Sequence, residues 1–139
     1  MGRGGIYKLG MSTLAFVLFL GTSAFFMSTG IIYEREKQIA AQVFSLMQEV
    51  QKAQERYHEQ EGAYSSDLLA LDVYFENPYF RIGQLRPGES GSLTDSWSLT
   101  IKRADPVNPY RRYNVTFTEQ GFNPNQSSIK DSLLSGVPY

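Results

Sequence analysis

The chain contains one histidine, His58, and two glutamates, Glu55 and Glu59, lie close to it in the sequence. A histidine beside a carboxylate can bind a metal ion or move a proton. A metal site usually needs three or four ligands, however, and the sequence shows no such set converging on His58. The pattern therefore predicts that His58 is a surface residue near the end of a helix.

Three acidic residues, Asp67, Asp72 and Glu76, follow this segment, and carboxylates are calcium ligands. They lack the dense, regular spacing of an EF-hand loop. The chain has no cysteine, which excludes disulfides, zinc–thiolate sites, iron–sulfur clusters and cysteine nucleophiles. The sequence also has no glycine-rich phosphate loop and no motif of paired catalytic carboxylates. We therefore predict a non-enzymatic protein with no catalytic residue, metal, cofactor or small-molecule substrate.

Basic and aromatic residues gather on both sides of a proline-rich segment in the second half of the chain. Such a patch can bind nucleic acid or anionic lipid headgroups. The net charge of the chain is -1, which gives no general electrostatic footprint for nucleic acid. We therefore expect solvated strand ends here, and nucleic acid is not the favoured partner. The candidate partner surface comprises Tyr79, Arg103, Tyr110, Arg111 and Arg112.

The elements that position these residues show two periodicities, and the first is that of β-strands. Apolar and polar residues alternate over 96–102 and again over 111–118, on either side of the proline-rich segment. This pattern predicts an antiparallel strand pair with one buried face. A further strand is expected over 79–85, with Phe80 and Ile82 on one side. The tail, 123–139, is polar and contains glycine and proline, so it is expected to be irregular.

The second periodicity is helical. Apolar residues recur every three or four positions between Ile39 and Tyr57, and Gly62 supplies a stop signal. We predict one helix from about Thr13 to Gln60, and an alternative has two helices joined near Gly30. The apolar stripe would pack on the sheet, which gives an α+β fold with a long N-terminal helix on a small antiparallel sheet. Val50→Asp is expected to destabilise that packing.

The first part of the expected helix is strongly apolar. Residues 9–33 contain no charged side chain. A helix of that length rises about 37 Å, enough to cross roughly 30 Å of hydrocarbon with some tilt. A cleaved secretory signal usually has a shorter apolar core, so we predict a retained single-pass anchor over 11–33. Small residues for helix packing in the membrane are Gly21, Ser28 and Gly30.

The charges that flank this segment predict its orientation. Arg3 and Lys8 precede it, whereas the four charges from Glu34 to Lys37 that follow it cancel. The positive-inside rule then places the N-terminus in the cytoplasm and the C-terminal domain in the periplasm or outside the cell. We therefore expect a protein of the cytoplasmic (inner) membrane of a bacterium.

Two stretches resemble the type IV pilins and the pseudopilins of type II secretion. Lys8-Leu9-Gly10 is similar to the end of a prepilin leader, and the following residues, from Met11, to the start of a mature pilin. The stretch 53–71, "AQERYHEQEGAYSSDLLAL", is similar to the segment that follows the pilin helix. The resemblance covers about residues 8–71, and it implies a pilin-like fold and leader cleavage between Gly10 and Met11.

One position departs from the family pattern. The family has a glutamate at the fifth mature position, where this chain has Ala15. In the family that carboxylate is thought to meet the amino terminus of a neighbouring subunit during assembly. A charge inside lipid costs about 2.5–3.5 kcal/mol and is kept only for a purpose. Its absence argues against ordinary filament assembly, although a few tip-type minor pseudopilins also lack it.

These observations predict four segments: a cytoplasmic leader-like segment, a transmembrane helix, an amphipathic helix that continues it, and a β-rich extracytoplasmic domain with an irregular tail. The leader-like segment covers 1–10, the transmembrane helix 11–33, the amphipathic helix 34–62, and the β-rich domain with its tail 63–139. The favoured function is that of a membrane-anchored structural or interaction subunit. Its partners would be membrane lipid and the other subunits of a secretion or pilus machine, or of an energy-transducing complex such as a photosynthetic or respiratory one. Alternatives are a processed minor pilin or pseudopilin in a filament, and a domain that binds nucleic acid or another ligand.

Overall fold

The computed structural model describes the backbone of residues 6–104, 112–137 and 139, and the side chains of residues 29–104, 112–137 and 139. Helix α1 spans Ile6–Glu61 and does not end near Gly30, so the prediction of one long helix is confirmed. The chain divides into two compact units, residues 1–36 and 37–139. The described part of the first unit is the N-terminal part of α1, and the second unit contains the rest of α1 and the sheet.

The predicted membrane helix, 11–33, lies mostly outside the residues whose side chains are described. Among the described residues, none of the helices combines the length and the apolar character that a membrane crossing requires.

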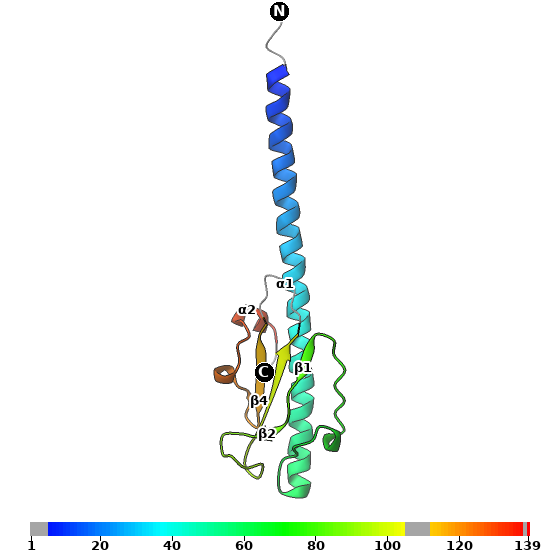
Figure 1. The fold of residues 1–139 in the computed structure, drawn as a ribbon, viewed down its shortest axis with the longest axis vertical. Coiled ribbons are helices and arrows are strands. Elements are labelled where there is room, and N and C mark those ends of the chain that lie inside the picture. Colours follow the sequence, from blue (N-terminus) through cyan, green and yellow to red (C-terminus); the bar gives the residue numbers. More distant parts are fainter. Residues whose placement is uncertain (1–5, 105–111, 138) are drawn as a thin grey trace, which may run out of the picture. The chain divides into compact units, whose positions relative to one another are not determined.

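Within the second unit, α1 lies alongside the sheet (Figure 1). A broad apolar stripe of this part of α1 is buried. The spacing predicts a stripe of six residues: Ile39, Val43, Leu46, Val50, Ala53 and Tyr57. Four of them are buried, whereas Leu46 and Tyr57 are only half-buried. The stripe is wider than predicted, because a helix that covers a sheet buries more than the narrow seam of a coiled coil. The buried residues of this part of α1 are Ile39, Ala40, Val43, Phe44, Met47, Val50, Ala53 and Gln54.

The sheet is antiparallel throughout, and its longest strand is β3, Trp97–Arg103. The strand order is β1-β3-β4-β5, where β4 is Asn114–Thr118 and β5 is Gly121–Phe122. Strands β1 (Phe80–Ile82) and β2 (Arg86–Pro87) both pair with β3, at different places along it. The predicted antiparallel pair is therefore confirmed as β3 and β4, with Ile101 opposite Val115.

The alternating pattern gives the sheet two different faces. Trp97, Leu99 and Ile101 of β3 are completely buried, as is Val115 of β4. They form the core together with α1, and the rings of Phe44 and Phe117 meet edge to face with 5.4 Å between their centroids. Burial of such side chains stabilises the fold by about 1.5–3 kcal/mol each. The opposite face carries the polar residues that alternate with them, such as Thr100 and Lys102. The helix and the antiparallel sheet together confirm the predicted α+β class.

The strand predicted over 79–85 is shorter in the structure. Strand β1 ends at Ile82, and the backbone N–H of Gly83 donates to the carbonyl of Thr100 at 2.9 Å. A Cβ atom at Gly83 would lie 2.6 Å from that carbonyl oxygen, so only glycine permits this approach. The chain then pairs with β3 again as β2, two residues long.

The turn after α1 is held by a side chain of the helix. Gln54 is completely buried, and its Nε2 donates to the Ser65 carbonyl at 2.9 Å while its Oε1 accepts from the Ser65 N–H at 2.8 Å. Gly62 has a φ of 76° and donates its N–H to the His58 carbonyl, which ends the helix. The following segment contains a short 3₁₀ helix, Leu69–Leu71.

The tail is more ordered than the prediction of an irregular segment implied. It contains a 3₁₀ helix, Pro124–Gln126, and a one-turn helix α2, Asp131–Leu134. Leu133 and Leu134 are buried, and so is Val137. The polar composition of the tail hides these apolar residues, which are too few to produce a periodic signal but still complete the core.

Candidate functional site

The sheet face that points away from α1 carries three rows of polar residues across its strands. Arg81 pairs with Lys102 on β3, and Lys102 pairs in turn with Asn114 on β4. The next row joins Thr100 to Thr116, whose hydroxyl oxygens are 2.9 Å apart. Paired residues point to the same side of a sheet, so their side chains share one surface. This surface is the outer face of the sheet.

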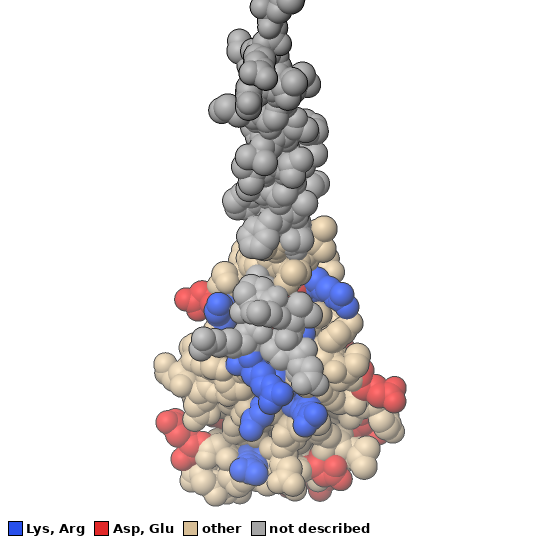
Figure 2. Space-filling model, turned by 45° about the horizontal axis from the view of Figure 1, so that its top comes forward, with Lys and Arg blue, Asp and Glu red and all other residues tan. Residues whose placement is uncertain are grey.

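The third row lies near the N-terminal end of β3. Arg86 of β2 pairs with Ser98, which also pairs with Thr118 of β4. Lys102 lies four residues beyond Ser98, a distance of about 13 Å along the strand. Exposed cations therefore stand near both ends of the outer face, with hydroxyl groups between them. Figure 2 shows Lys and Arg side chains gathered on one face of this unit, with most Asp and Glu towards its margin.

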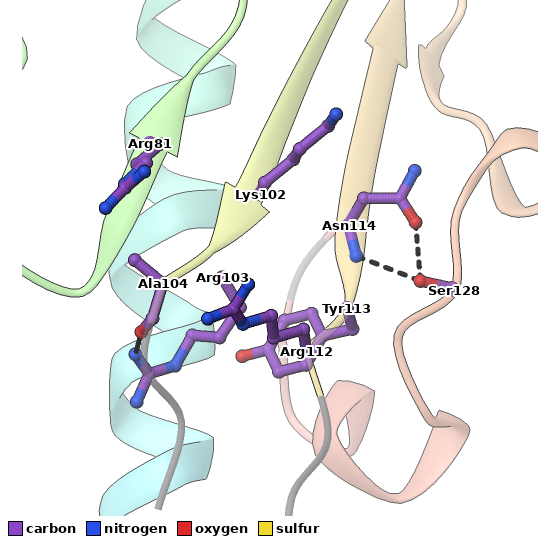
Figure 3. A pocket seen from close by; sticks show the side chains of 8 residues that line it. All are labelled: Arg81, Lys102, Arg103, Ala104, Arg112, Tyr113, Asn114 and Ser128. Atoms are coloured by element: carbon purple, nitrogen blue, oxygen red, sulfur yellow. Dashed lines mark hydrogen bonds between the residues drawn. The ribbon is translucent and has the colours of Figure 1, made fainter.

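A hollow of about 360 Å³ lies at the end of this face that holds Arg81 and Lys102 (Figure 3). We call it the basic hollow. Its lining residues come from β1, β3, β4 and the tail: Arg81, Lys102, Arg103, Ala104, Arg112, Tyr113, Asn114 and Ser128. Four of the eight are cationic, and none of the described residues that line it is acidic.

A second hollow of about 350 Å³ adjoins the first, because Lys102 lines both. Arg86 supplies a further cation, and Gly83, Gln84, Pro87, Ser98 and Thr100 complete its described lining. This lining also lacks an acidic residue. The outer face therefore offers hydrogen-bond donors and positive charge, which suit an anionic ligand.

Arg103 is largely buried, whereas the sequence predicts that it contributes to a partner surface. It is only 3% exposed, because it belongs to the inward-facing residues at the end of β3. Its guanidinium donates to the carbonyls of Tyr79 and Ala104 and lies 5.4 Å from the centre of the Tyr79 ring. Arg103 thus fixes the end of β1 against β3, and only part of it reaches the basic hollow.

The other residues of the predicted partner surface differ in burial and position. Tyr79 is half-buried beneath the Arg103 guanidinium, and Arg112 is exposed and lines the basic hollow. Tyr110 and Arg111 lie outside the described residues. The structure therefore brings Arg103 and Arg112 to one hollow.

The polar groups of the hollow's wall are largely bonded to one another. The N–H of Asn114 donates to Ser128 Oγ at 2.9 Å, and Ser128 Oγ lies against Asn114 Oδ1. The side-chain amide of Asn114 donates to the Gln126 carbonyl at 3.0 Å. Tyr113 is buried and packs edge to face on Phe80, with 6.1 Å between ring centroids. The cations are therefore the principal groups that the hollow offers to a ligand.

His58 occupies the position at the helix end that the sequence predicts. It is half-buried, its Nε2 lies 2.8 Å from the Thr94 carbonyl, and its ring stacks on Tyr64 at 4.3 Å. Within the described part of the chain, no cluster of three or more His, Asp or Glu residues could hold a metal ion. His58 thus ties the end of α1 to the loop before β3.

Tyr64 is a titratable group of the described part of the chain whose pKa the fold clearly perturbs. Burial raises the pKa of its hydroxyl, and the negative charges of Glu119, Glu55 and Asp95 raise it further. A tyrosine with a raised pKa stays neutral in the physiological range. This shift therefore bears on stability at high pH and indicates no acid–base chemistry at neutral pH.

The side chains of the predicted membrane segment are described only from Thr29 onwards. Gly10, Met11, Gly21 and Ser28 lie outside the residues whose side chains are described. Gly30 is exposed on α1, and no described atom lies within 4 Å of a Cβ added there. That open position is compatible with its predicted role in packing against another helix.

The sequence interpretation did not include Arg81 or Arg86 in the basic cluster. Arg81 lies between Phe80 and Ile82, so the alternating pattern places it on the polar face of a strand. Which edge of β3 that strand occupies is a matter of tertiary pairing, and a single sequence carries no signal for it. Known protein families, curated proteins and solved structures provide no match to this chain. Its function must therefore be inferred from its own residues and their geometry.

Proposed function

We propose that this protein is a non-enzymatic subunit, anchored in the cytoplasmic membrane by residues 11–33 of the uncharged segment 9–33, that presents its C-terminal unit to a larger membrane complex. The observation that carries the proposal is the continuity of α1, Ile6–Glu61. One helix contains both the uncharged segment and the apolar stripe on which the sheet packs. A membrane anchor and a folded unit that share one helix suit a structural role.

The pilin resemblance supports the same function. A long N-terminal helix whose second part packs on a small antiparallel sheet is the arrangement that the resemblance implies. Ala15, in place of the family's glutamate, favours an anchored subunit over an ordinary filament subunit. The flanking charges favour an extracytoplasmic C-terminal unit, which would meet its partners outside the cytoplasm.

Membrane anchoring is testable with the full chain expressed in its native host. We expect the protein to stay in the membrane pellet after a wash at alkaline pH and to be released only by detergent. Leu18→Arg places a charge in the uncharged segment and should reduce membrane retention. Ser45→Arg, on the exposed face of α1, is the matched control and should not. Release of the unchanged protein by the alkaline wash would refute the anchor.

Two further measurements separate the anchored subunit from a processed filament subunit. The intact mass of the membrane-extracted protein should include Met1 to Gly10 if the segment is a permanent anchor. A mass that begins at Met11 would instead favour the filament subunit. The detergent extract should also migrate on a native gel as part of a larger complex, and migration as a lone small protein would contradict the docking function.

A further inference from the structure

We infer that the basic hollow is a binding site for phosphate groups, which Arg81 and Lys102 bind through their cationic side chains. The inference does not depend on the membrane anchor, because every residue that carries it belongs to the second unit. Its ligand class is an ester or lipid headgroup that carries at least one phosphate.

The first step is the cross-strand pair of like charges. Arg81 and Lys102 are direct neighbours on β1 and β3, and both are exposed on the outer face. Like charges opposite each other on a sheet repel and destabilise it. The described lining of the hollow contains no carboxylate that would neutralise them. A bound anion would replace this repulsion with attraction to both side chains.

The second step concerns the kind of anion. An arginine guanidinium matches the geometry of a phosphate with two parallel hydrogen bonds, and a lysine ammonium adds a point charge. Arg112 also lines the hollow and raises its positive potential, whatever its own contacts within the protein. A volume of about 360 Å³ has room for a phosphate ester or for the headgroup of a lipid.

The third step distinguishes phosphate groups from nucleic acid. Proteins that bind single strands combine a basic groove with exposed aromatic rings on which the bases stack. The aromatic residue in the described lining, Tyr113, is buried and packed against Phe80. The described lining therefore provides charge without an exposed aromatic ring for stacking, which favours a phosphate group over a base.

The test uses the full chain in micelles of a nonionic detergent and measures binding by calorimetry. The probes are inorganic pyrophosphate and short-chain phosphatidylglycerol, with short-chain diacylglycerol as a comparison lipid that carries no phosphate. The variant Arg81→Gln/Lys102→Gln removes two exposed cations from the hollow. The matched control, Lys52→Gln/Arg56→Gln, removes two exposed cations from α1 and changes the net charge equally. Thermal unfolding confirms that both variants fold.

We expect binding to weaken at least tenfold in Arg81→Gln/Lys102→Gln and less than twofold in the control. Binding of pyrophosphate would identify a soluble phosphate compound as a ligand source. Binding of phosphatidylglycerol alone would identify a lipid headgroup, and both results support the site. Absence of binding to both probes, or equal loss in the two variants, would overturn it.

A last arm uses single-stranded oligothymidylate at the same salt concentration. Affinity for phosphate alone predicts that the oligonucleotide binds no more than tenfold more tightly, per occupied site, than pyrophosphate does. Binding more than a hundredfold tighter, and lost in Arg81→Gln/Lys102→Gln, would instead assign the surface to nucleic acid and overturn the phosphate site. A negative result in any arm leaves the membrane anchor untouched, because that proposal is tested by fractionation.

Discussion

Val50→Asp tests the packing of α1 on the sheet at its centre. Val50 is completely buried and lies among the apolar residues of the stripe. Loss of its buried surface costs about 1.5–3 kcal/mol, and an unsatisfied polar group adds about 1–3 kcal/mol. Val50→Asn should therefore lower the free energy of unfolding by roughly 2.5–6 kcal/mol, a large part of the 5–15 kcal/mol typical of a domain.

The carboxyl group of Val50→Asp adds a cost that depends on pH. Full burial raises the pKa of a carboxyl group by up to about 3–5 units above its usual value near 3.9. In the pH range between the two values, the unfolded chain releases the proton while the folded chain retains it. Stability then falls as pH rises, by up to about 1.4 kcal/mol per pH unit. Val50→Asp and Val50→Asn should thus be similar near pH 4 and should diverge towards pH 7.

The assay is urea unfolding of the full chain in nonionic detergent, followed by the fluorescence of Trp97. Trp97 is the only tryptophan and is completely buried beside the same core, so its emission reports on this unit. Ser45→Asp, on the exposed face of α1, should shift the midpoint by less than about 0.5 kcal/mol. A Val50→Asp variant as stable as Ser45→Asp at pH 7 would refute the packing of the helix on the sheet.

Other features of the fold give shorter tests by the same unfolding assay. Leu133→Ala should lower the free energy of unfolding by about 2–5 kcal/mol because Leu133 is completely buried, whereas Leu69→Ala, at a side chain 67% exposed, should have little effect. Gln54→Ala should cost about 1–3 kcal/mol, because it leaves the N–H and carbonyl of Ser65 without their partner. The raised pKa of Tyr64 predicts that stability is retained below the usual tyrosine pKa and lost as pH rises through the folded value. Tyr64→Phe should lose less stability above about pH 10 than the unchanged protein does, and an equal loss would contradict the shift.

The core of the second unit was predictable because two periodicities specify it. The alternation around Trp97 and Val115 places both on the inner face, and the helical spacing from Ile39 to Val50 places those residues under the sheet. These patterns are local, so one sequence contains them. The order of the strands is not local, and neither is the burial of Leu133 in a polar tail. Both depend on which distant segments offer apolar surface and free strand edges.

The candidate site shows the same limit more sharply. The sequence placed Lys102, Arg103 and Arg112 near one loop, but their roles depend on the register of β1 against β3. Arg103 lies on the inner face of β3 and donates a hydrogen bond to the carbonyl of Tyr79. Lys102, one residue earlier, lies on the outer face. The pairing of Phe80 with Arg103 then brings Arg81 opposite Lys102. The charges of a site built from cross-strand neighbours can therefore be identified only when the pairing of the strands is known.

The like-charge pair of Arg81 and Lys102 is tolerated because other contacts hold β1 in place. Arg103 bonds the Tyr79 carbonyl at 3.0 Å, and the Ala104 N–H donates to the same oxygen at 2.8 Å. Phe80 is buried, and its burial contributes more than the roughly 0.2–1 kcal/mol at which charged cross-strand pairs are valued. Strand β1 therefore does not require a favourable partner for Arg81. The inner face supplies the stability of this edge, which leaves the outer face free to concentrate positive charge for a ligand.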